Sequence, residues 1–127
     1  MSDFNNKLYF FSPNNDETIL SNGTIFSFKQ YDQLIQASLK GDKIIHGELV
    51  GLIDKNGELA FSMNYQMLDR QVYGGSGRLK ACFLTGSRLK GSCSVTNGYD
   101  TYEFSFFLEK LSLQDQMAVK NKKTCLQ

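Results

Sequence analysis

Hydrophobic and polar residues alternate one by one along most of this chain. In the segment 58–68, every second residue is large and apolar (Leu59, Phe61, Met63, Tyr65 and Met67), with small or polar residues between them. A period of two residues is typical of a β-strand that has one face buried and the other in water. We predict strands near residues 7–12, 23–31, 33–40, 43–53, 58–68, 77–85, 88–96 and 101–110.

Short turn sequences separate these segments. Gly41-Asp42 and Gly86-Ser87 place glycine first, as a type II′ hairpin requires, because glycine adopts a positive φ at little cost. Asp54–Gly57 and Asn97-Gly98 are turn sequences of the same kind. Hairpin joints at this regular spacing predict an all-β fold: a single antiparallel up-and-down β-barrel of about eight strands. Its interior would be filled by side chains or would hold one small ligand.

Two segments do not follow the alternation. Residues 69–77, with the sequence DRQVYGGSG, are predicted to form a flexible loop that would cover a binding site as a lid. The same glycines could cradle a phosphate, but the Lys-Ser/Thr pair and the helix of a phosphate loop do not follow them. From Ser112 onward we expect a short C-terminal helix or tail. The chain would then be one domain over 1–127, with 1–6 and 112–127 peripheral.

Composition narrows the classes of partner. Lys and Arg number 14 against 13 Asp and Glu, a net charge of +1, which argues against nucleic-acid binding. There is neither an N-terminal leader nor a run of the roughly 18 to 20 apolar residues that a spanning helix needs, so no membrane partner is expected. The cysteines (Cys82, Cys93 and Cys125) lack CxxC spacing and are expected to be free thiols in the cytoplasm, with Cys93 packed inward. One histidine and this cysteine spacing predict neither a metal nor a cofactor.

His46 and Glu48 are the most chemically suggestive pair, because they stand two residues apart on one strand. If the face carrying Ile45, Gly47 and Leu49 is inward, both polar residues lie on the outer surface, and this is our prediction. The alternative is that a bulge near Gly47 turns His46 into the lumen as a general base.

The predicted inward faces carry an aromatic and apolar set that would line the barrel. The predicted ligand-binding residues are Phe26, Phe28, Gln30, Phe61, Met63, Tyr65, Tyr102, Phe104 and Phe106. In a hollow barrel, the phenols of Tyr65 and Tyr102 and the amide of Gln30 would orient an apolar ligand; in a filled barrel, the whole set is core. Small inward residues such as Gly47 and Gly91 favour a cavity, although glycines also serve barrel curvature.

Two stretches carry a further pattern. They are Thr24-Ile25-Phe26 followed by Gln30, Leu34, Ala37, Gly41 and Ile44, and Gly47-x-Leu49-x-Gly51-Leu52-Ile53-Asp54 followed by Gly57, Leu59 and Tyr65-Gln66. This pattern resembles a family of small bacterial proteins that genomes often label N-acetylglutamate synthase. The resemblance implies a compact β-barrel, similar in outline to avidin-like or lipocalin-like barrels. An acetyltransferase would be expected to carry an Arg/Gln-x-x-Gly-x-Gly/Ala turn before a helix, and the nearest sequence, 71–76, precedes no helical start.

We therefore predict a small barrel that binds a mostly apolar molecule in its lumen. If it is an enzyme, we expect a cofactor-free cyclase or isomerase, with Tyr65 and Tyr102 as the catalytic candidates, because such catalysis needs positioning and a phenol rather than a triad. The alternative is a non-catalytic interaction or self-association module with a filled core, which would use Ile25, Tyr31 and Phe107 as an exposed face.

Overall fold

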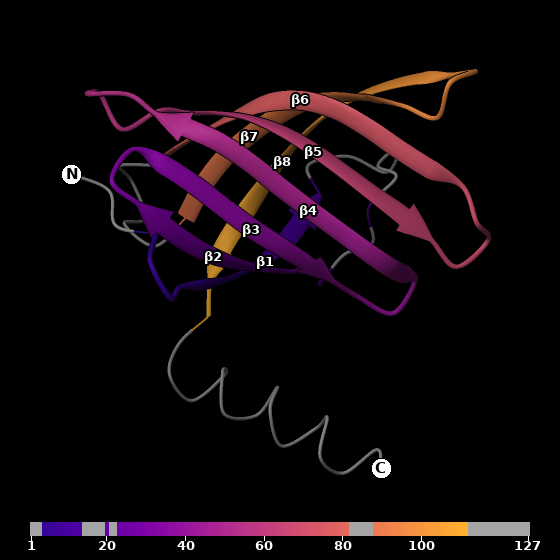
Figure 1. Ribbon diagram of the computed structural model, residues 1–127, viewed down its shortest axis with the longest axis horizontal. Helices are drawn as coiled ribbons and strands as arrows, with labels where there is room; N and C mark the ends of the chain where they lie inside the picture. The colour runs from indigo at the N-terminus through magenta and orange to yellow at the C-terminus, as the bar shows by residue number, and fades with distance from the viewer. Residues whose placement is uncertain (1–3, 14–19, 21–22, 82–87, 112–127) are drawn as a thin grey trace, which may run out of the picture.

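Each strand of this protein pairs antiparallel with its neighbours along the chain, and the last strand returns to the first. The computed structural model describes residues 4–13, 20, 23–81 and 88–111. The strands are β1 (Leu8–Pro13), β2 (Ile25–Tyr31), β3 (Leu34–Lys40), β4 (Ile44–Ile53), β5 (Leu59–Met67), β6 (Val72–Ala81), β7 (Arg88–Thr96) and β8 (Thr101–Lys110). Figure 1 shows β3 and β4 in front of β7 and β8, on the opposite side of the barrel. The predicted eight-stranded up-and-down barrel is confirmed.

Alternation along the strands places one side of the sheet inside the barrel. In β3, Ile35, Ala37 and Leu39 are buried and their neighbours exposed, and β5 repeats this pattern. Phenylalanine rings from three strands meet in the interior: Phe11 lies 5.1 Å from Phe106 and 6.4 Å from Phe26 between ring centroids. Among the described residues there is no helix with an apolar run long enough to cross a lipid bilayer.

The strand β6 begins at Val72, so the prediction of a flexible loop or lid over 69–77 is wrong for most of that segment. Its glycines lie within the ladder, where Gly75 pairs with Met63 on one side and with Val95 on the other. A Cβ on Gly75 would lie 1.9 Å from the carbonyl oxygen of Ser94. Gly75 and Gly77, whose added Cβ would lie 2.2 Å from the Ser92 carbonyl oxygen, are therefore needed for the close approach of β6 and β7.

A bulge interrupts the start of β4, between Ile44 and His46. The extra residue turns Ile45 outward, although simple alternation placed it on the same inward face as Gly47. Beyond the bulge the alternation resumes, so His46 and Glu48 are both exposed and Gly47 and Leu49 are buried. The predicted outward position of His46 is thus confirmed, and the bulge does not carry its side chain into the lumen.

The described turns agree only in part with their predicted types. Gly57, at φ +82°, donates its N–H to the Asp54 carbonyl at 3.0 Å, and Gly98 has φ +96°, so both turns form where they were predicted. Gly41 is wrong as the positive-φ residue of a II′ turn: it precedes the two central residues, and its carbonyl accepts the Ile44 N–H at 3.3 Å. Gly86-Ser87 and the predicted helix from Ser112 lie outside the described residues.

The turns divide the barrel into two ends. One end carries the 32–33 and 54–58 turns and is called the Phe4 end here, because Phe4 is buried there with its ring 4.9 Å from that of Phe28. The Phe4 N–H donates to Gln30 Oε1 at 2.8 Å, so this part of the segment expected to be peripheral is packed against the core. The other end carries the 41–43, 68–71 and 97–100 turns and is called the tyrosine end.

Candidate functional site

Three tyrosines from three strands meet inside the tyrosine end. Tyr65 lies near the last residue of β5, Tyr73 is the second residue of β6, and Tyr102 is the second residue of β8. The Tyr65 and Tyr73 rings are stacked with centroids 5.3 Å apart, and Tyr73 meets Tyr102 edge to face at 6.3 Å. Both predicted catalytic candidates, Tyr65 and Tyr102, therefore belong to one cluster, with Tyr73 between them.

The hydroxyl of Tyr65 is the most unusual group in this cluster. The residue is 1% exposed, and no described residue lies within hydrogen-bonding distance of its Oη atom. Buried hydroxyls nearly always find a partner, because an unsatisfied one costs about 1 to 3 kcal/mol. A phenylalanine would fill the same space without that cost, so the hydroxyl needs an explanation outside folding.

Burial also sets the protonation state of the cluster. It raises the pKa of Tyr65, and the neighbouring Cys93 and Tyr73 raise that pKa further because their ionised forms would be negative. The pKa of the buried Cys93 thiol is raised to about 12. The pKa of Tyr73 is also raised, first by burial and then by Tyr102. At neutral pH the phenols of Tyr65 and Tyr73 are therefore hydrogen-bond donors rather than bases, and Cys93 is a thiol rather than a nucleophilic thiolate.

Tyr73 was missed by sequence reasoning because residues 69–77 were interpreted as a loop. The signal was present: Tyr73, Gly75, Gly77 and Leu79 continue the period of two backward from the strand predicted at 77–85. The three glycines of this segment were interpreted as signs of a loop, and the alternation was therefore overlooked.

The structure divides the predicted ligand-binding residues between the two ends and the middle of the lumen. Seven of them are buried (Phe26, Phe28, Phe61, Met63, Tyr65, Phe104 and Phe106), and Gln30 and Tyr102 are half-buried. Gln30 lies at the Phe4 end, where its amide accepts the Phe4 N–H and donates to the Asp32 carbonyl at 2.8 Å. Because both ends of this amide are engaged by the chain itself, Gln30 is not included in the site proposed below.

The inward glycines do not leave the space that their small size suggested. A Cβ on Gly91 would lie 2.5 Å from Phe106 Cζ and 2.6 Å from Leu79 Cδ2, so neighbouring side chains already cover this glycine. A Cβ on Gly51 would lie 2.3 Å from the Ala60 carbonyl oxygen. These positions are glycine because strands and rings approach closely, and the interior around them is filled.

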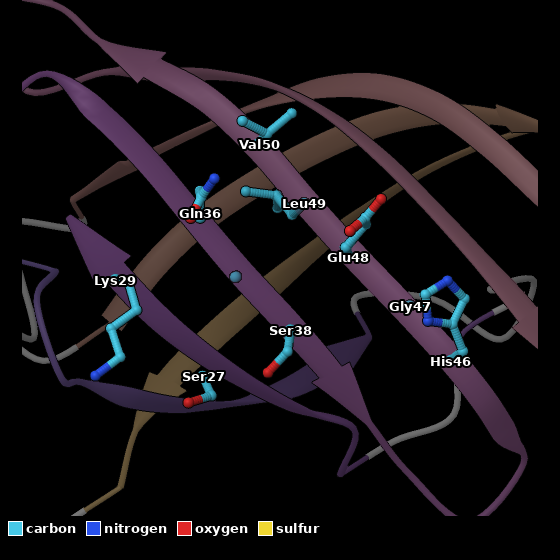
Figure 2. A pocket seen from close by; sticks show the side chains of 10 residues that line it. Ser27, Lys29, Gln36, Ser38, His46, Gly47, Glu48, Leu49 and Val50 are labelled. Atoms are coloured by element: carbon cyan, nitrogen blue, oxygen red, sulfur yellow. The ribbon is translucent and has the colours of Figure 1, made fainter. Parts of the chain in front are cut away.

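Several hollows open to solvent, and two of them are lined by His46 or by Gln30, residues that the sequence analysis singled out. Figure 2 shows the first, about 580 Å³, on the outer face of β2, β3 and β4, where His46, Glu48 and Gln36 point outward. The second, about 670 Å³, lies at the Phe4 end between the 32–33 and 54–57 turns, with Ile53 among its lining residues. In the first, the polar side chains lie on the outer surface rather than converging in an enclosed site. His46 and Glu48 consequently have the surroundings of surface residues.

Comparison with known proteins identifies the family of this barrel but not a ligand. A family described as "Avidin-like protein" matches residues 2–98. No curated protein and no solved structure matches the chain. The match agrees with the avidin-like outline of the barrel, and none of these comparisons supports the N-acetylglutamate synthase label.

Proposed function

Because the chain belongs to the avidin-like family, we propose that it binds a small, mostly apolar molecule in the tyrosine end of its barrel. The observation that carries the proposal is the Tyr65 hydroxyl, which is buried without a partner among the described residues. A ligand with one hydrogen-bonding group, such as a carbonyl or hydroxyl oxygen, would satisfy that hydroxyl. The rest of the ligand would contact apolar side chains.

The exposure of the three tyrosines decreases in steps from Tyr102 to Tyr65. Tyr102 is half-buried, Tyr73 is 9% exposed and Tyr65 is 1% exposed. Met67 and Ile44 are partly buried beside the core and supply movable apolar surface near the same end. Methionine is flexible enough to repack around a guest. A ligand would enter beside Tyr102, displace Met67 and place its polar group at Tyr65.

A catalytic form of this proposal is a cofactor-free cyclase or isomerase. Since the raised pKa keeps Tyr65 protonated, its phenol would donate a hydrogen bond to a ligand carbonyl and polarise it. Tyr102, the other candidate, would hold the chain of the ligand in a reactive conformation. We also retain the predicted cytoplasmic location, with which a free, buried Cys93 thiol is compatible.

Native mass spectrometry of the protein purified from the organism that makes it tests the binding. The expected result is a stoichiometric small molecule that is lost on denaturation, and its mass would identify the ligand. An enzyme would carry a mixture of two isomeric ligands, or would convert one into the other on incubation, whereas a binding protein would return its ligand unchanged.

A matched pair of variants then assigns the site. Tyr65→Phe removes only the unpartnered hydroxyl and should weaken ligand binding by about tenfold, or 1.4 kcal/mol. Tyr31→Phe removes an exposed hydroxyl at the Phe4 end and should leave the affinity unchanged. Equal affinities of Tyr65→Phe and the parent protein for the recovered ligand would contradict the proposed role of this hydroxyl. A protein that carries no ligand, and that binds none of the host's extracted small molecules, would contradict the proposed function.

A further inference from the structure

Apolar side chains are exposed at the rim of the tyrosine end. The described residues have eight exposed large hydrophobic side chains, and half of these lie on the outer face of β2, β3 and β4. The other half are at the tyrosine end, and we call them the apolar rim: Ile45, Leu68, Val72 and Tyr99, with Leu68 60% and Tyr99 93% exposed. Figure 1 shows the three turns of this end together, at the right of the view.

Hydrogen bonds join the parts of the chain that carry the rim. The Leu68 N–H donates to the Lys43 carbonyl at 2.8 Å, which connects the end of β5 to the turn before β4. Asn97 Nδ2 donates to Gln71 Oε1 at 3.1 Å, which connects the β7–β8 turn to the residue before β6. The rim is therefore one continuous arc along β4, β5, β6 and the β7–β8 turn, and not a set of scattered surface hydrophobics, which would need no explanation.

We propose that the apolar rim docks on the surface of a lipid bilayer with zwitterionic headgroups. The inference rests on the proposed function, because Val72 directly precedes Tyr73 and Tyr99 stands three residues before Tyr102, so the rim adjoins the opening where an apolar ligand would enter. A mostly apolar molecule leaves water for the interior of a bilayer. A barrel whose opening touches that bilayer takes up its ligand without passing it through water.

The size and form of the rim favour a bilayer over a protein partner. A specific protein interface buries about 800 Å² on each partner, over roughly 20 to 30 residues. The rim has only four side chains, placed on turns and at strand ends. A bilayer requires no complementary shape, and tyrosine is enriched at its surface because the ring is apolar and the hydroxyl reaches the headgroups. The exposed ring of Tyr99 suits this environment.

The charges beside the rim indicate the class of headgroup. The three turns carry Asp42, Asp69 and Asp100 against Lys43 and Arg70, and none of these side chains forms an ion pair within the described part of the chain. An anionic surface attracts clusters of Lys and Arg, and this end has no such excess. A phosphocholine headgroup carries both signs, and its quaternary ammonium is attracted to tyrosine rings and to carboxylates.

The expectation of no membrane partner rested on the lack of a spanning segment. Docking on the surface of a bilayer requires no such segment. The proposal therefore concerns a different kind of membrane contact from the one that the sequence argued against.

The exposed face predicted from the sequence is only partly present. Tyr31 is exposed, but Ile25 and Phe107 are half-buried. The Arg88 guanidinium lies over the Phe107 ring at 3.8 Å and covers it. The expectation that Ile25 and Phe107 are exposed is therefore wrong.

Cosedimentation of the full chain with phosphatidylcholine vesicles tests the docking. We expect binding, and Leu68→Ser should weaken it about fivefold or more, because it removes apolar surface that would enter the bilayer. Leu52→Ser is the matched control: Leu52 is 62% exposed but lies on the outer face of β4, so its replacement should leave vesicle binding unchanged. Because both leucines are exposed, neither variant should unfold the barrel. Phosphatidylserine added to the vesicles should not strengthen binding.

A tryptophan placed in the rim provides a second, independent readout. The chain has no tryptophan, so Tyr99→Trp introduces a single fluorescent reporter. Its emission should shift to shorter wavelength when phosphatidylcholine vesicles are added, and lipids brominated in their acyl chains should quench it. Tyr31→Trp, with the reporter at the Phe4 end, should show neither response.

Three results would overturn the proposal. They are no binding to phosphatidylcholine vesicles, which would leave a protein as the partner of the rim; binding only to vesicles that contain phosphatidylserine; and equal weakening by Leu68→Ser and Leu52→Ser. Vesicle binding is measured without ligand, and the ligand affinity of Tyr65→Phe is measured without vesicles. Failure of the docking is therefore distinguishable from failure of the proposed ligand binding.

Discussion

Replacing Gly75 with alanine should destabilise the barrel far more than the same replacement at the adjacent Gly74. A Cβ on Gly75 would lie 1.9 Å from the Ser94 carbonyl oxygen and 2.7 Å from Val95 Cα, and both of these are backbone atoms of β7. A Cβ on Gly74 would have its nearest neighbour at 3.8 Å, an ordinary contact. The two positions share a strand and a residue type and differ in the space around them.

The magnitude follows from the overlap at Gly75. To reach an ordinary contact of about 3.5 Å, β6 and β7 would have to separate by about 1.5 Å. A separation of that size weakens the ladder hydrogen bonds on both sides of Gly75, each worth about 1 kcal/mol, in addition to the ~1 to 3 kcal/mol of overpacking. We expect Gly75→Ala to lower the free energy of unfolding by about 3 kcal/mol or more. Gly74→Ala should change it by less than ~1 kcal/mol, in the stabilising direction, because alanine loses less backbone entropy in a strand than glycine.

Urea unfolding measures both changes. The chain has six tyrosines and no tryptophan, so tyrosine fluorescence and far-ultraviolet circular dichroism are suitable probes. A Gly75→Ala protein that does not fold at all agrees with the prediction, provided that Gly74→Ala folds normally. Similar, small effects at both positions would refute the reasoning, since they would show that residues 74 and 75 lie in a flexible segment and not between two closely approaching strands.

Two further predictions concern His46 and Cys93. His46 is exposed on the outer face, so His46→Ala should leave ligand affinity within a factor of about two and the free energy of unfolding within ~0.5 kcal/mol. A tenfold loss of affinity in a binding titration would instead place His46 at the ligand site. The pKa of the Cys93 thiol is raised by burial from 9.0 to about 12, so the folded state holds its proton more tightly than the unfolded state, and stability should fall as pH rises above 9 by up to about 1.4 kcal/mol per pH unit. Cys93→Ala should make this alkaline decline shallower in urea unfolding at a series of pH values, and an unchanged slope would contradict burial as the cause.

The fold could be predicted from the sequence wherever alternation was strict. The strands predicted at 88–96 and 101–110 match β7 and β8, and the strand predicted at 58–68 differs from β5 by one residue at each end. These segments combine one apolar face with one polar face, and the period of two then leaves a single choice of register.

The errors share one physical cause, which is that local residue preferences do not report the distance between strands. Glycines at 74, 75 and 77 indicated a loop because glycine is unfavourable in strands, but at Gly75 and Gly77 a Cβ would overlap backbone atoms of β7. The local sequence likewise does not reveal the bulge at Ile44/His46, because the bulge depends on how β4 pairs with β5. For the same reason, only two of the three clustered tyrosines were predicted. Tyr65 and Tyr102 lie on strands with strict alternation, whereas Tyr73 lies on β6, whose glycines indicated a loop.

The different constructions of the two barrel ends bear directly on where a ligand would enter. At the Phe4 end, strand pairing between β1 and β2 is continued by the N-terminal segment: Asn6 N–H donates to the Phe28 carbonyl at 3.0 Å, and Phe28 N–H donates to the Lys7 carbonyl at 2.9 Å. Gln30 then holds the main chain of Phe4 over the lumen. A ligand entering there would have to break these backbone bonds, each worth about 1 kcal/mol net and more if left unpaired.

At the tyrosine end, a guest would instead meet side chains whose exposure decreases stepwise from Tyr102 to Tyr65. Displacing the half-buried Met67 changes rotamers and breaks no backbone hydrogen bond, so its cost is small compared with opening the Phe4 end. Tyr65, the least exposed of the three, carries the one described hydroxyl that is buried without a partner. The tyrosine end, where entry would cost less free energy, therefore also holds the unsatisfied hydroxyl. This arrangement is expected if the barrel folds first and a ligand then supplies the missing hydrogen-bond partner.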